Sequence, residues 1–504
     1  MPKKTDQTKM TERPPIIAVM GHIDHGKSTL LDYIRKTNTT EKEAGGITQH
    51  IAAYEITHDH AGTPKRITFI DTPGHEAFAA IRSRGASIAD IAILVVSAED
   101  GVKPQTLEAL KFIKETETPF VVALTKIDKE SANLERAKQS LAENEIYVEN
   151  YGGSIPCVPV SAKSGEGVPE LLDMVLLMAE LEELKADPEA PGEGFVLEAE
   201  LDTKKGITAT LIIKNGCLKT GMAIVAGDTY VPVRIMEDFN GKKITEANVG
   251  SPVRLIGWSD VPPTGESWHA VSNKREAEKY IEEKKASAAR PSGKKNDSVS
   301  SETNAVVPIV IKADTVGGTE AIEHERKKIN IERVEVKIIL KGVGDISERD
   351  LKAAAGNEKP LVVGFHVSLD PRLGQLPERI GAEIQTFDII YRLTEWITEK
   401  LKSRAPKITV EEFKAELKVL KLFSKTKNDQ VVGGRVEKGK LSTGDTIRVR
   451  RRESIICEGV VKGLQTQKDK VRDVEEGKEC GVLVEAKLEI AVGDRLEAFT
   501  FVER

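Results

Sequence analysis

The residues Gly21–Thr29, with the sequence GHIDHGKST, constrain the fold of this chain more than any other stretch. An apolar run at 15–20 precedes them and predicts a buried strand, and Leu30–Ile34 predicts the first turns of a helix. A strand, a loop of spacing G-x4-G-K-S and a helix together predict a phosphate-binding loop. Its glycines let backbone N–H groups turn toward an anion, and the helix N-terminus adds the positive end of its dipole.

Length and composition set outer limits. A chain of 504 residues is too long for one core and predicts three or four domains. Its net charge of −6 gives no overall basic surface, so any nucleic-acid binding must use local patches. The four cysteines lack C-x-x-C spacing, which argues against a zinc site or a disulfide framework and suits a reducing compartment. Residues 1–14 are polar and are expected to be a disordered leader.

No signal region and no apolar run of about 18 residues occur, so we expect a soluble, cytoplasmic protein without a membrane partner.

Residues 15–185 alternate short apolar runs with segments of helical spacing. The runs that predict strands are 67–70, 91–96, 120–124 and 157–160, and the segments that predict helices are 76–87, 105–117 and 134–144. This alternation indicates a mostly parallel sheet with helices on both faces. Ligands of such sheets bind beyond the carboxyl ends of the strands, so the loops there should carry the chemistry.

Three segments are suited to nucleotide phosphates and Mg²⁺. In the first, Lys27 is expected to reach the β- and γ-phosphates and Ser28 to ligate Mg²⁺. The loop 43–50 contains paired glycines that suggest mobility, and Thr48 can reach Mg²⁺ when a γ-phosphate is present. After the strand ending at Ile70, Asp71 can hold a Mg²⁺-bound water and the Gly74 N–H can face the γ-phosphate. The predicted phosphate-binding residues are Gly21, His22, Ile23, Asp24, His25, Gly26, Lys27, Ser28, Thr29, Asp71, Thr72, Pro73 and Gly74, and the predicted metal ligands are Ser28, Thr48 and Asp71.

Two further loops are suited to a guanine base. Asp128 follows the strand ending at Leu124, and its carboxylate can accept from both N1–H and the 2-amino group of guanine. Adenine has no such pair of donors, so this residue type favours GTP over ATP. The loop after Val160 can close over the base. The predicted guanine-binding residues are Thr125, Lys126, Ile127, Asp128, Ser161, Ala162 and Lys163.

The rest of the chain divides by pattern. Residues 186–272 alternate in the manner of an antiparallel β-barrel, and their motif Asn215–Val225 recurs as Lys438–Arg448. The predicted architecture is therefore multidomain, α/β and β. Its parts are a P-loop GTPase domain with a mostly parallel sheet (15–185), a β-barrel (186–272), a charged helix and linker (273–304), an α/β/α domain (305–387), a long connecting helix (388–404) and a second β-barrel (405–504).

The segments GHIDHGKST, EAGGITQHI, DTPGHEAF and TKID, with a predicted barrel after them, resemble those of the translational GTPases. The later segments VIKAD (310–314), GVGDIS (342–347) and ECG (479–481) are similar to those of the bacterial translation initiation factor 2 family, and the resemblance extends from about residue 15 to 504.

This resemblance implies a monomeric GTPase that uses GTP and Mg²⁺. It implies that the chain places formyl-methionyl initiator tRNA on the small ribosomal subunit, promotes joining of the large subunit and hydrolyses GTP on the ribosome. The implied partners are both ribosomal subunits, ribosomal RNA, initiator tRNA and other initiation factors. It further implies that His75 orients the attacking water, and that Lys468, Glu479, Cys480 and Gly481 contact the initiator tRNA.

The sequence also departs from the family pattern. Thr125 stands where the family usually has Asn, residues 465–468 read QTQK in place of a basic-aromatic stretch, and Gly434 replaces a cysteine. Arginines at 448 and 450–452 offer a basic patch for an acceptor stem or, equally, a solvated hairpin tip.

Two alternative functions stay open. A specialised elongation factor is disfavoured by the α/β domain between the barrels and by the 479–481 motif. A ribosome-binding module with a degenerate nucleotide site is disfavoured because Lys27, Ser28, Thr48, Asp71 and His75 are all retained.

Overall fold

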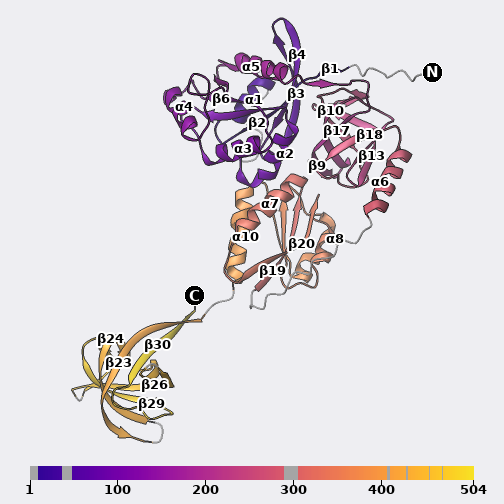
Figure 1. Ribbon diagram of the computed structural model, residues 1–504. Coiled ribbons are helices and arrows are strands. Elements are labelled where there is room, and N and C mark those ends of the chain that lie inside the picture. Colours follow the sequence, from indigo (N-terminus) through magenta and orange to yellow (C-terminus); the bar gives the residue numbers. More distant parts are fainter. Residues whose placement is uncertain are drawn as a thin grey trace. The chain divides into compact units, whose positions relative to one another are not determined.

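The computed structural model describes residues 10–36, 48–288, 305–405, 409–426, 429–452, 454–467 and 469–503. The chain forms two units, Met1–Arg404 and Ala405–Arg504 (Figure 1). Four predictions lie wholly or partly outside the described residues: the disordered leader over 1–9, the mobility of the loop over 43–47, the linker over 289–304, and Lys468. Among the described helices, none is long and apolar enough to cross a membrane.

The first sheet of unit 1 has six strands, and all are parallel except one edge hairpin. Their order across the sheet is β3 (Ala52–His60), β4 (Thr63–Asp71), β2 (Ile16–Gly21), β5 (Ile91–Ser97), β6 (Phe120–Thr125) and β7 (Cys157–Pro159). The pair β3–β4 is antiparallel, and every other neighbouring pair is parallel. The strands predicted from the apolar runs are present. The edge strand β3, which is polar and half-exposed, was not predicted.

Helices cover both faces of this sheet, as predicted. Alternate residues of β2 point to opposite sides, so Ile17 and Val19 join one core and Ala18 and Met20 the other. The first core is closed by α1 (Lys27–Arg35) and α5 (Val168–Leu181). The second is closed by α2 (Ala79–Ile88), α3 (Pro104–Glu115) and α4 (Leu134–Glu143). A short 3-10 turn, η2 (Glu76–Phe78), precedes α2.

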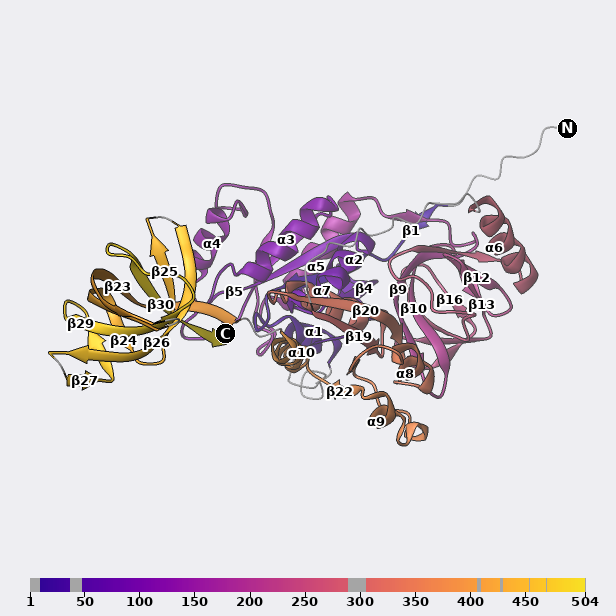
Figure 2. The same cartoon turned by 90° about the horizontal axis from the view of Figure 1, so that it is seen from below.

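The next region is an eight-stranded antiparallel sheet. Its strands, in spatial order, are β13 (Thr229–Pro232), β12 (Ala223–Ala226), β18 (Ser267–Val271), β9 (Glu193–Asp202), β10 (Gly206–Asn215), β17 (Pro252–Ile256), β14 (Ile235–Asp238) and β15 (Lys243–Ile244). β13 and β15 are the two edge strands of this sheet. Within the described residues they do not pair with each other, so hydrogen bonds between them do not close the sheet into the predicted barrel. A separate pair, β11 (Leu218–Lys219) and β16 (Glu246–Ala247), covers the same core with Leu218 and Ala247. Figure 2 shows α6 (Lys274–Ala288) beside β12 and β13.

The third region is a four-stranded parallel sheet with the order β20 (Val334–Val343), β19 (Ala305–Ala313), β21 (Leu361–Phe365) and β22 (Glu383–Phe387). Its helices are α7 (Val316–Lys328), α8 (Glu348–Ala354), α9 (Leu376–Ile380) and the long α10 (Ile390–Arg404), with a 3-10 turn η3 at Pro371–Leu373. One apolar cluster joins the three regions of unit 1, because Ile81 of α2, Leu197 of β9 and Ile309 of β19 all belong to it.

The prediction that residues 1–14 are disordered is wrong for 10–14. The short strand β1 (Thr11–Glu12) pairs with β8 (Lys185–Ala186), and the two terminal guanidinium nitrogens of Arg13 donate to the two Asp90 carboxylate oxygens, each at 2.7 Å. Composition hid this order, because two residues of pairing and one buried ion pair leave no periodic pattern. Residues 1–9 lie outside the described residues.

Unit 2 is a closed antiparallel barrel of six strands. Around the barrel run β23 (Thr409–Lys425), β30 (Arg495–Glu503), β25 (Thr446–Arg451), β26 (Ser454–Thr466), β29 (Glu479–Ala486) and β24 (Asp429–Ser442), and β24 pairs back to β23. Two short strands, β27 (Asp469–Val471) and β28 (Asp473–Glu475), pair with β26 and β24. The predicted fold class, α/β and β with a GTPase-type parallel sheet and a barrel, is confirmed.

Candidate nucleotide-binding site

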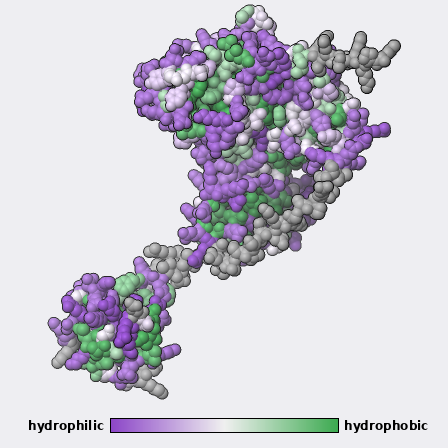
Figure 3. All heavy atoms as spheres, viewed as in Figure 1, coloured by the Kyte–Doolittle hydropathy of each residue, from purple (hydrophilic) through white to green (hydrophobic). Residues whose placement is uncertain are grey.

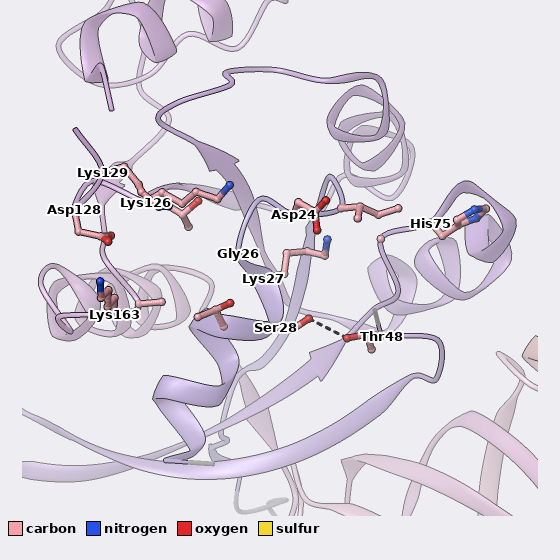
Figure 4. Close-up of a pocket in the computed structure, with 15 residues that line it drawn as sticks. Asp24, Gly26, Lys27, Ser28, Thr48, His75, Lys126, Asp128, Lys129 and Lys163 are labelled. Atoms are coloured by element: carbon pink, nitrogen blue, oxygen red, sulfur yellow. Dashed lines mark hydrogen bonds between the residues drawn. The ribbon is translucent and has the colours of Figure 1, made fainter. Parts of the chain in front are cut away.

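A cavity of about 340 Å³ lies at the carboxyl ends of the parallel strands of the first sheet. Four predicted loops and the segment around Thr48 border it (Figure 4). Its lining residues are Ile23, Asp24, Gly26, Lys27, Ser28, Thr29, Thr48, Gly74, His75, Thr125, Lys126, Asp128, Lys129, Ala162 and Lys163. Ile23 and Lys163, which are 140 positions apart in sequence, therefore face one space.

The loop after β2 is wound tightly because its two glycines have positive φ angles, 146° at Gly21 and 84° at Gly26. A Cβ at Gly21 would lie 2.4 Å from the Val95 carbonyl oxygen, so a side chain there would push the loop off β5. Lys27 is buried, and its Nζ donates to the Gly21 and His22 carbonyls at 2.9 and 2.7 Å. Burial lowers the pKa of Lys27 to about 8. A phosphate beside it would stabilise the charged form again.

Two hydroxyls meet at the edge of this loop. Ser28 Oγ lies 2.9 Å from Thr48 Oγ1 (Figure 4), which brings the first turn of α1 to the segment before β3. Hard oxygen ligands of this kind suit Mg²⁺. Asp71 is the last residue of β4 and is buried, and its negative charge favours the protonated form of Lys27. Gly74 packs so closely that a Cβ there would lie 2.6 Å from Lys27 Nζ.

His75 borders the cavity, but its ring points away from Lys27 (Figure 4). Its Nδ1 accepts from the Ala77 N–H at 2.8 Å and caps η2, so the neutral ring carries its proton on Nε2. The ring packs edge-on against Tyr391 of α10, with centroids 4.2 Å apart. Burial lowers the pKa of His75, which favours this neutral form. The backbone before it is held by Arg82, which donates to the Pro73 carbonyl at 3.0 Å.

On the base side, Asp128 is exposed and accepts from the Ser161 hydroxyl at 2.8 Å. This hydrogen bond lowers the pKa of Asp128 below its usual value, so the carboxylate stays ionised. Thr125, at the position where Asn is usual, donates its hydroxyl to the His25 carbonyl and thereby ties β6 to the phosphate loop. Lys126 has a left-handed backbone (φ 62°) and lies 3.6 Å from Glu99.

Several predicted residues do not line the cavity. Gly21, His22 and His25 shape the loop from behind: His25 is buried, accepts from the Ser97 N–H at 3.3 Å, and has its pKa lowered by burial to about 3. Thr72 donates to the Val19 carbonyl at 2.8 Å and joins β4 to β2. The others outside the lining are Asp71, Pro73, Ile127 and Ser161.

Two contributors were missed. Lys129 lines the cavity, and Gln105 of α3 accepts from the Ile23 N–H at 3.0 Å. Lys129 directly follows the TKID motif, so the motif could have pointed to it. Gln105 lies in a helix far along the chain, and no sequence signal marks it.

A second cavity, of about 380 Å³, lies on the barrel of unit 2 between β26, β27 and β29. Its lining residues are Val431, Thr443, Lys462, Gly463, Leu464, Gln465, Lys470, Val471, Gly481 and Leu483. Of the three predicted initiator-binding residues that the structure describes, Gly481 lines it and the other two do not. Glu479 is exposed and Cys480 points into the barrel core, since side chains alternate along β29. Of the four arginines of the predicted basic patch, Arg448, Arg450 and Arg451 are paired with carboxylates, for example Arg448 with Glu411 at 3.0 Å.

The surface of this unit carries apolar areas among its charges (Figure 3). Its exposed large apolar side chains include Phe413, Leu420, Leu422 and Phe423. The cavity beside Gly481 is itself lined by four aliphatic side chains and two lysines, so it can take an apolar group carried by an anion.

The chain matches four protein-family models. Residues 12–180 match the elongation factor Tu GTP binding domain, and 282–398 match translation-initiation factor 2. Residues 191–271 match elongation factor G domain 2, and 429–497 match elongation factor Tu domain 2. Translation initiation factor IF-2 of Rubrobacter xylanophilus is 40% identical over 502 residues, which cover 98% of this chain and 72% of that protein. The chain belongs to the translation initiation factor IF-2 family.

A second relative of the same name, from Caldanaerobacter subterraneus subsp. tengcongensis, is 41% identical over 97% of this chain and 70% of its own length. Among solved structures, GDP-bound aIF5B from Aeropyrum pernix is similar, with 27% identity, a TM-score of 0.46 and coverage of 97% of this chain and 92% of that one. As a member of the family, this chain is a GTP-dependent translation initiation factor that binds GTP and hydrolyses it.

Proposed function

We propose that this factor binds Mg²⁺–GTP in the cavity beyond the first parallel sheet and uses it to control initiator tRNA on the ribosome. The observation that carries this proposal is the convergence of Lys27, the Ser28–Thr48 hydroxyl pair and Asp128 on one space. The phosphate loop supplies Lys27 and Ser28, the segment before β3 supplies Thr48, and the loop after β6 supplies Asp128, so three separate segments provide groups suited to phosphate, metal and base.

In this proposal the backbone of Gly21–Thr29 surrounds the phosphates, and Lys27 exchanges its carbonyl partners for phosphate oxygens. Ser28, Thr48 and Asp71 would hold Mg²⁺ at this place, because their hydroxyl and carboxylate oxygens are the ligands that it prefers. When bound, Mg²⁺ neutralises charge that develops on the phosphate oxygens. Asp128 reads the guanine edge, while Ser161 fixes the carboxylate and Ala162 and Lys163 close the far side.

Hydrolysis is assigned to His75. With Nδ1 committed to the Ala77 N–H, Nε2 is the atom that can bond the attacking water. To reach that water, the His75 ring has to leave its contact with Tyr391 and turn into the cavity. The ribosome would stabilise this second conformation. His75→Ala should therefore slow ribosome-stimulated hydrolysis by roughly 10²–10⁴ while GTP affinity stays nearly unchanged.

The finer role is placement of formyl-methionyl initiator tRNA on the small subunit and promotion of large-subunit joining, with contacts to ribosomal RNA and other initiation factors. The cavity beside Gly481 supports the tRNA part, because it is apolar, is bordered by Lys462 and Lys470, and has room for a methionyl side chain. A Cβ at Gly481 would still leave about 4 Å to Gln465, so Gly481→Ala should be tolerated and the bulkier Gly481→Val should weaken binding.

The test uses a nucleotide-specificity switch. Asp128→Asn loses the charge-assisted pair to guanine, about 2–4 kcal/mol, and presents an amide donor to the 2-oxo group of xanthine. Retention of initiator over elongator tRNA on small subunits is then measured with GTP and with XTP. We expect wild type to respond to GTP and the variant to XTP. If the variant still responds to GTP, Asp128 does not read the base; if neither nucleotide affects retention, control of tRNA by this site is wrong.

A further inference from the structure

Three side chains from separate segments meet at one edge of the four-stranded parallel sheet. His50 lies two residues beyond Thr48, Asp314 directly follows β19, and His366 directly follows β21. One nitrogen from each ring and one carboxylate oxygen lie within 4.8 Å of one another. His50 Nε2 is 2.7 Å from Asp314 Oδ2, and His366 Nδ1 is 3.8 Å from the same oxygen. Two imidazoles and a carboxylate form a ligand set for a divalent transition metal.

The strand order places this cluster where parallel sheets bind ligands. After β19 the chain crosses to β20 on one side, and after β21 it crosses to β22 on the other side. Connections therefore leave β19 and β21 in opposite directions, which opens a crevice beyond their carboxyl ends. Asp314 and His366 occupy those two ends. The position thus points to a ligand site independently of the side chains present.

The hydrogen bonds of His366 prepare one of its nitrogens as a ligand. Its Nε2 lies 2.8 Å from the Asp388 carbonyl, and since a carbonyl only accepts, Nε2 carries the proton. Its Nδ1 therefore presents a lone pair. Within the described residues this buried atom has no hydrogen-bond partner, and neither does Asp314 Oδ1. A histidine ligand whose other nitrogen donates to a carbonyl is the usual arrangement at metal centres.

Without a cation the arrangement is unfavourable. The Nδ1 lone pair of His366 faces a carboxylate oxygen at 3.8 Å, too far for a shared proton and close enough for repulsion. Ligands of one Zn²⁺ at bond lengths near 2.0–2.1 Å lie about 3.3 Å apart, between the two separations observed here. His366 also has a left-handed backbone (φ 52°), a conformation that is strained for a non-glycine residue. Its N–H donates to the Phe387 carbonyl at 2.9 Å and holds it there.

We propose that His50, Asp314 and His366 bind one divalent transition-metal ion, with Zn²⁺ as the best fit. The side chain of His50 is 44% exposed, so a water can complete a tetrahedral set of three protein ligands. The cysteine pattern argued against zinc, but here the ligands are histidine and aspartate drawn from positions 264 and 52 residues apart.

The bound ion would link the nucleotide site to α10. His50 follows Thr48, and Gln49 between them donates to the Asp388 carbonyl at 2.9 Å. Its amide oxygen accepts from the Ile390 N–H at the start of α10 at 3.4 Å. A metal at His50 therefore fixes the segment that carries Thr48 against the parallel sheet, at the end from which α10 departs.

The chain supplies its own matched control. His58 Nε2 and His60 Nδ1 both lie near Asp173 Oδ1, at 3.1 and 2.7 Å. This second set has the same composition, but each ring nitrogen is within hydrogen-bond distance of the carboxylate, so it lacks the unpartnered lone pair of His366. It should not bind metal at concentrations that fill the first site.

The experiment titrates the chelator-treated full chain with Co²⁺, followed by its visible absorption, and then displaces it with Zn²⁺. We expect one Co²⁺ per chain, no thiolate charge-transfer band, and a Zn²⁺-dependent rise in melting temperature. His366→Asn and Asp314→Asn should each weaken binding more than tenfold and abolish that rise. His58→Asn should change neither.

Stoichiometric binding that His366→Asn leaves intact would overturn the proposal, as would the absence of any Co²⁺ or Zn²⁺ binding to wild type. Loss of binding in His58→Asn alone would move the site to Asp173 and would also overturn it. Far-UV circular dichroism of each metal-free variant establishes that a loss of binding is not a loss of fold.

Discussion

The two antiparallel β regions, 193–271 and 409–503, have glycine turns at matching positions, but these turns pack against other parts of unit 1 in the first region and have open space around them, within the described residues, in the second. Gly250 and Gly477 stand at matching positions with φ angles of 86° and 85°, and Gly265 and Gly493 match with 82° and 94°. In the first region a Cβ at Gly250 would lie 3.0 Å from the Pro14 ring, and one at Gly265 would lie 3.4 Å from Arg84. At Gly477 and Gly493 no described atom lies within 4 Å of that point.

The cores differ in the same way. Leu197 and Ile212 of the first region belong to an apolar cluster with residues of the nucleotide-binding region and of the parallel sheet. Polar contacts reinforce this: the Thr68 hydroxyl donates to the Gly250 carbonyl at 2.8 Å, and Lys214 pairs with Asp90 at 2.7 Å. Among the described residues, the apolar cluster of the second region consists of residues from that region alone. The two β regions thus share a strand arrangement, but the first packs against the rest of unit 1 and the second forms its own core.

The largest effect should appear when each region is expressed alone. Residues 405–504 should fold and unfold cooperatively, because their apolar cluster is complete. Residues 186–272 should not, since part of their apolar surface is buried only by the rest of unit 1. Circular dichroism melting curves of the two fragments measure this. Cooperative unfolding of the shorter fragment would contradict the distinction.

Asp90→Ala in the full chain should destabilise unit 1 by about 3–5 kcal/mol, because it removes the shared partner of two buried cations. Asp90 accepts from Arg13, Lys214 and the Ile16 N–H, and its side chain is only 7% exposed. Denaturant unfolding gives the difference. Asp429→Ala is the matched control in the barrel: its pair with Lys462 is about 40% exposed and should contribute at most about 1 kcal/mol. Equal losses would mean that Asp90 is not an anchor.

The stability of unit 1 should fall as the pH rises, because of Glu198 in the first β region. Burial raises the pKa of Glu198 from 4.5 to about 7, although Arg84 lies 3.9 Å away. The folded state therefore holds a proton that the unfolded state releases, so unit 1 should lose about 2–3 kcal/mol between pH 4.5 and 7. Glu198→Gln should flatten this part of the profile. A profile unchanged by Glu198→Gln would assign the dependence to other groups.

The smallest effect sharpens the comparison most directly. Gly477→Ala should cost only the strain of a left-handed backbone, about 1–2 kcal/mol, because space around it is open. Gly250→Ala carries the same strain and also presses on Pro14, which should add about 1 kcal/mol. The two values come from denaturant unfolding of the units that contain them. A larger loss of unfolding free energy for Gly250→Ala would measure the contact of this turn with Pro14. Equal losses would show that Pro14 moves aside at no cost.

Local patterns predicted much of this molecule because the signals lie in contiguous residues. The phosphate loop, the strands 67–70 and 91–96 and the helix at 388–404 each follow from spacing within one segment. Prediction failed for β3, whose polar residues hide its pairing, and for residues 10–14, whose order depends on Asp90. The prediction that Cys480 and Gly481 border one pocket also failed for Cys480, because neighbouring residues on a strand face opposite sides and Cys480 faces the barrel core.

The sequence by itself determined the GTPase class of the first sheet, the order of the β and α/β regions and the recurrence of one strand plan, because short motifs and periodicity encode local structure. Only the tertiary structure decided that His75 packs on Tyr391 and that Thr125 ties β6 to the phosphate loop. It alone brought His50, Asp314 and His366 together. These contacts join residues up to 316 positions apart, and no local pattern records which distant side chain will fill the space beside another.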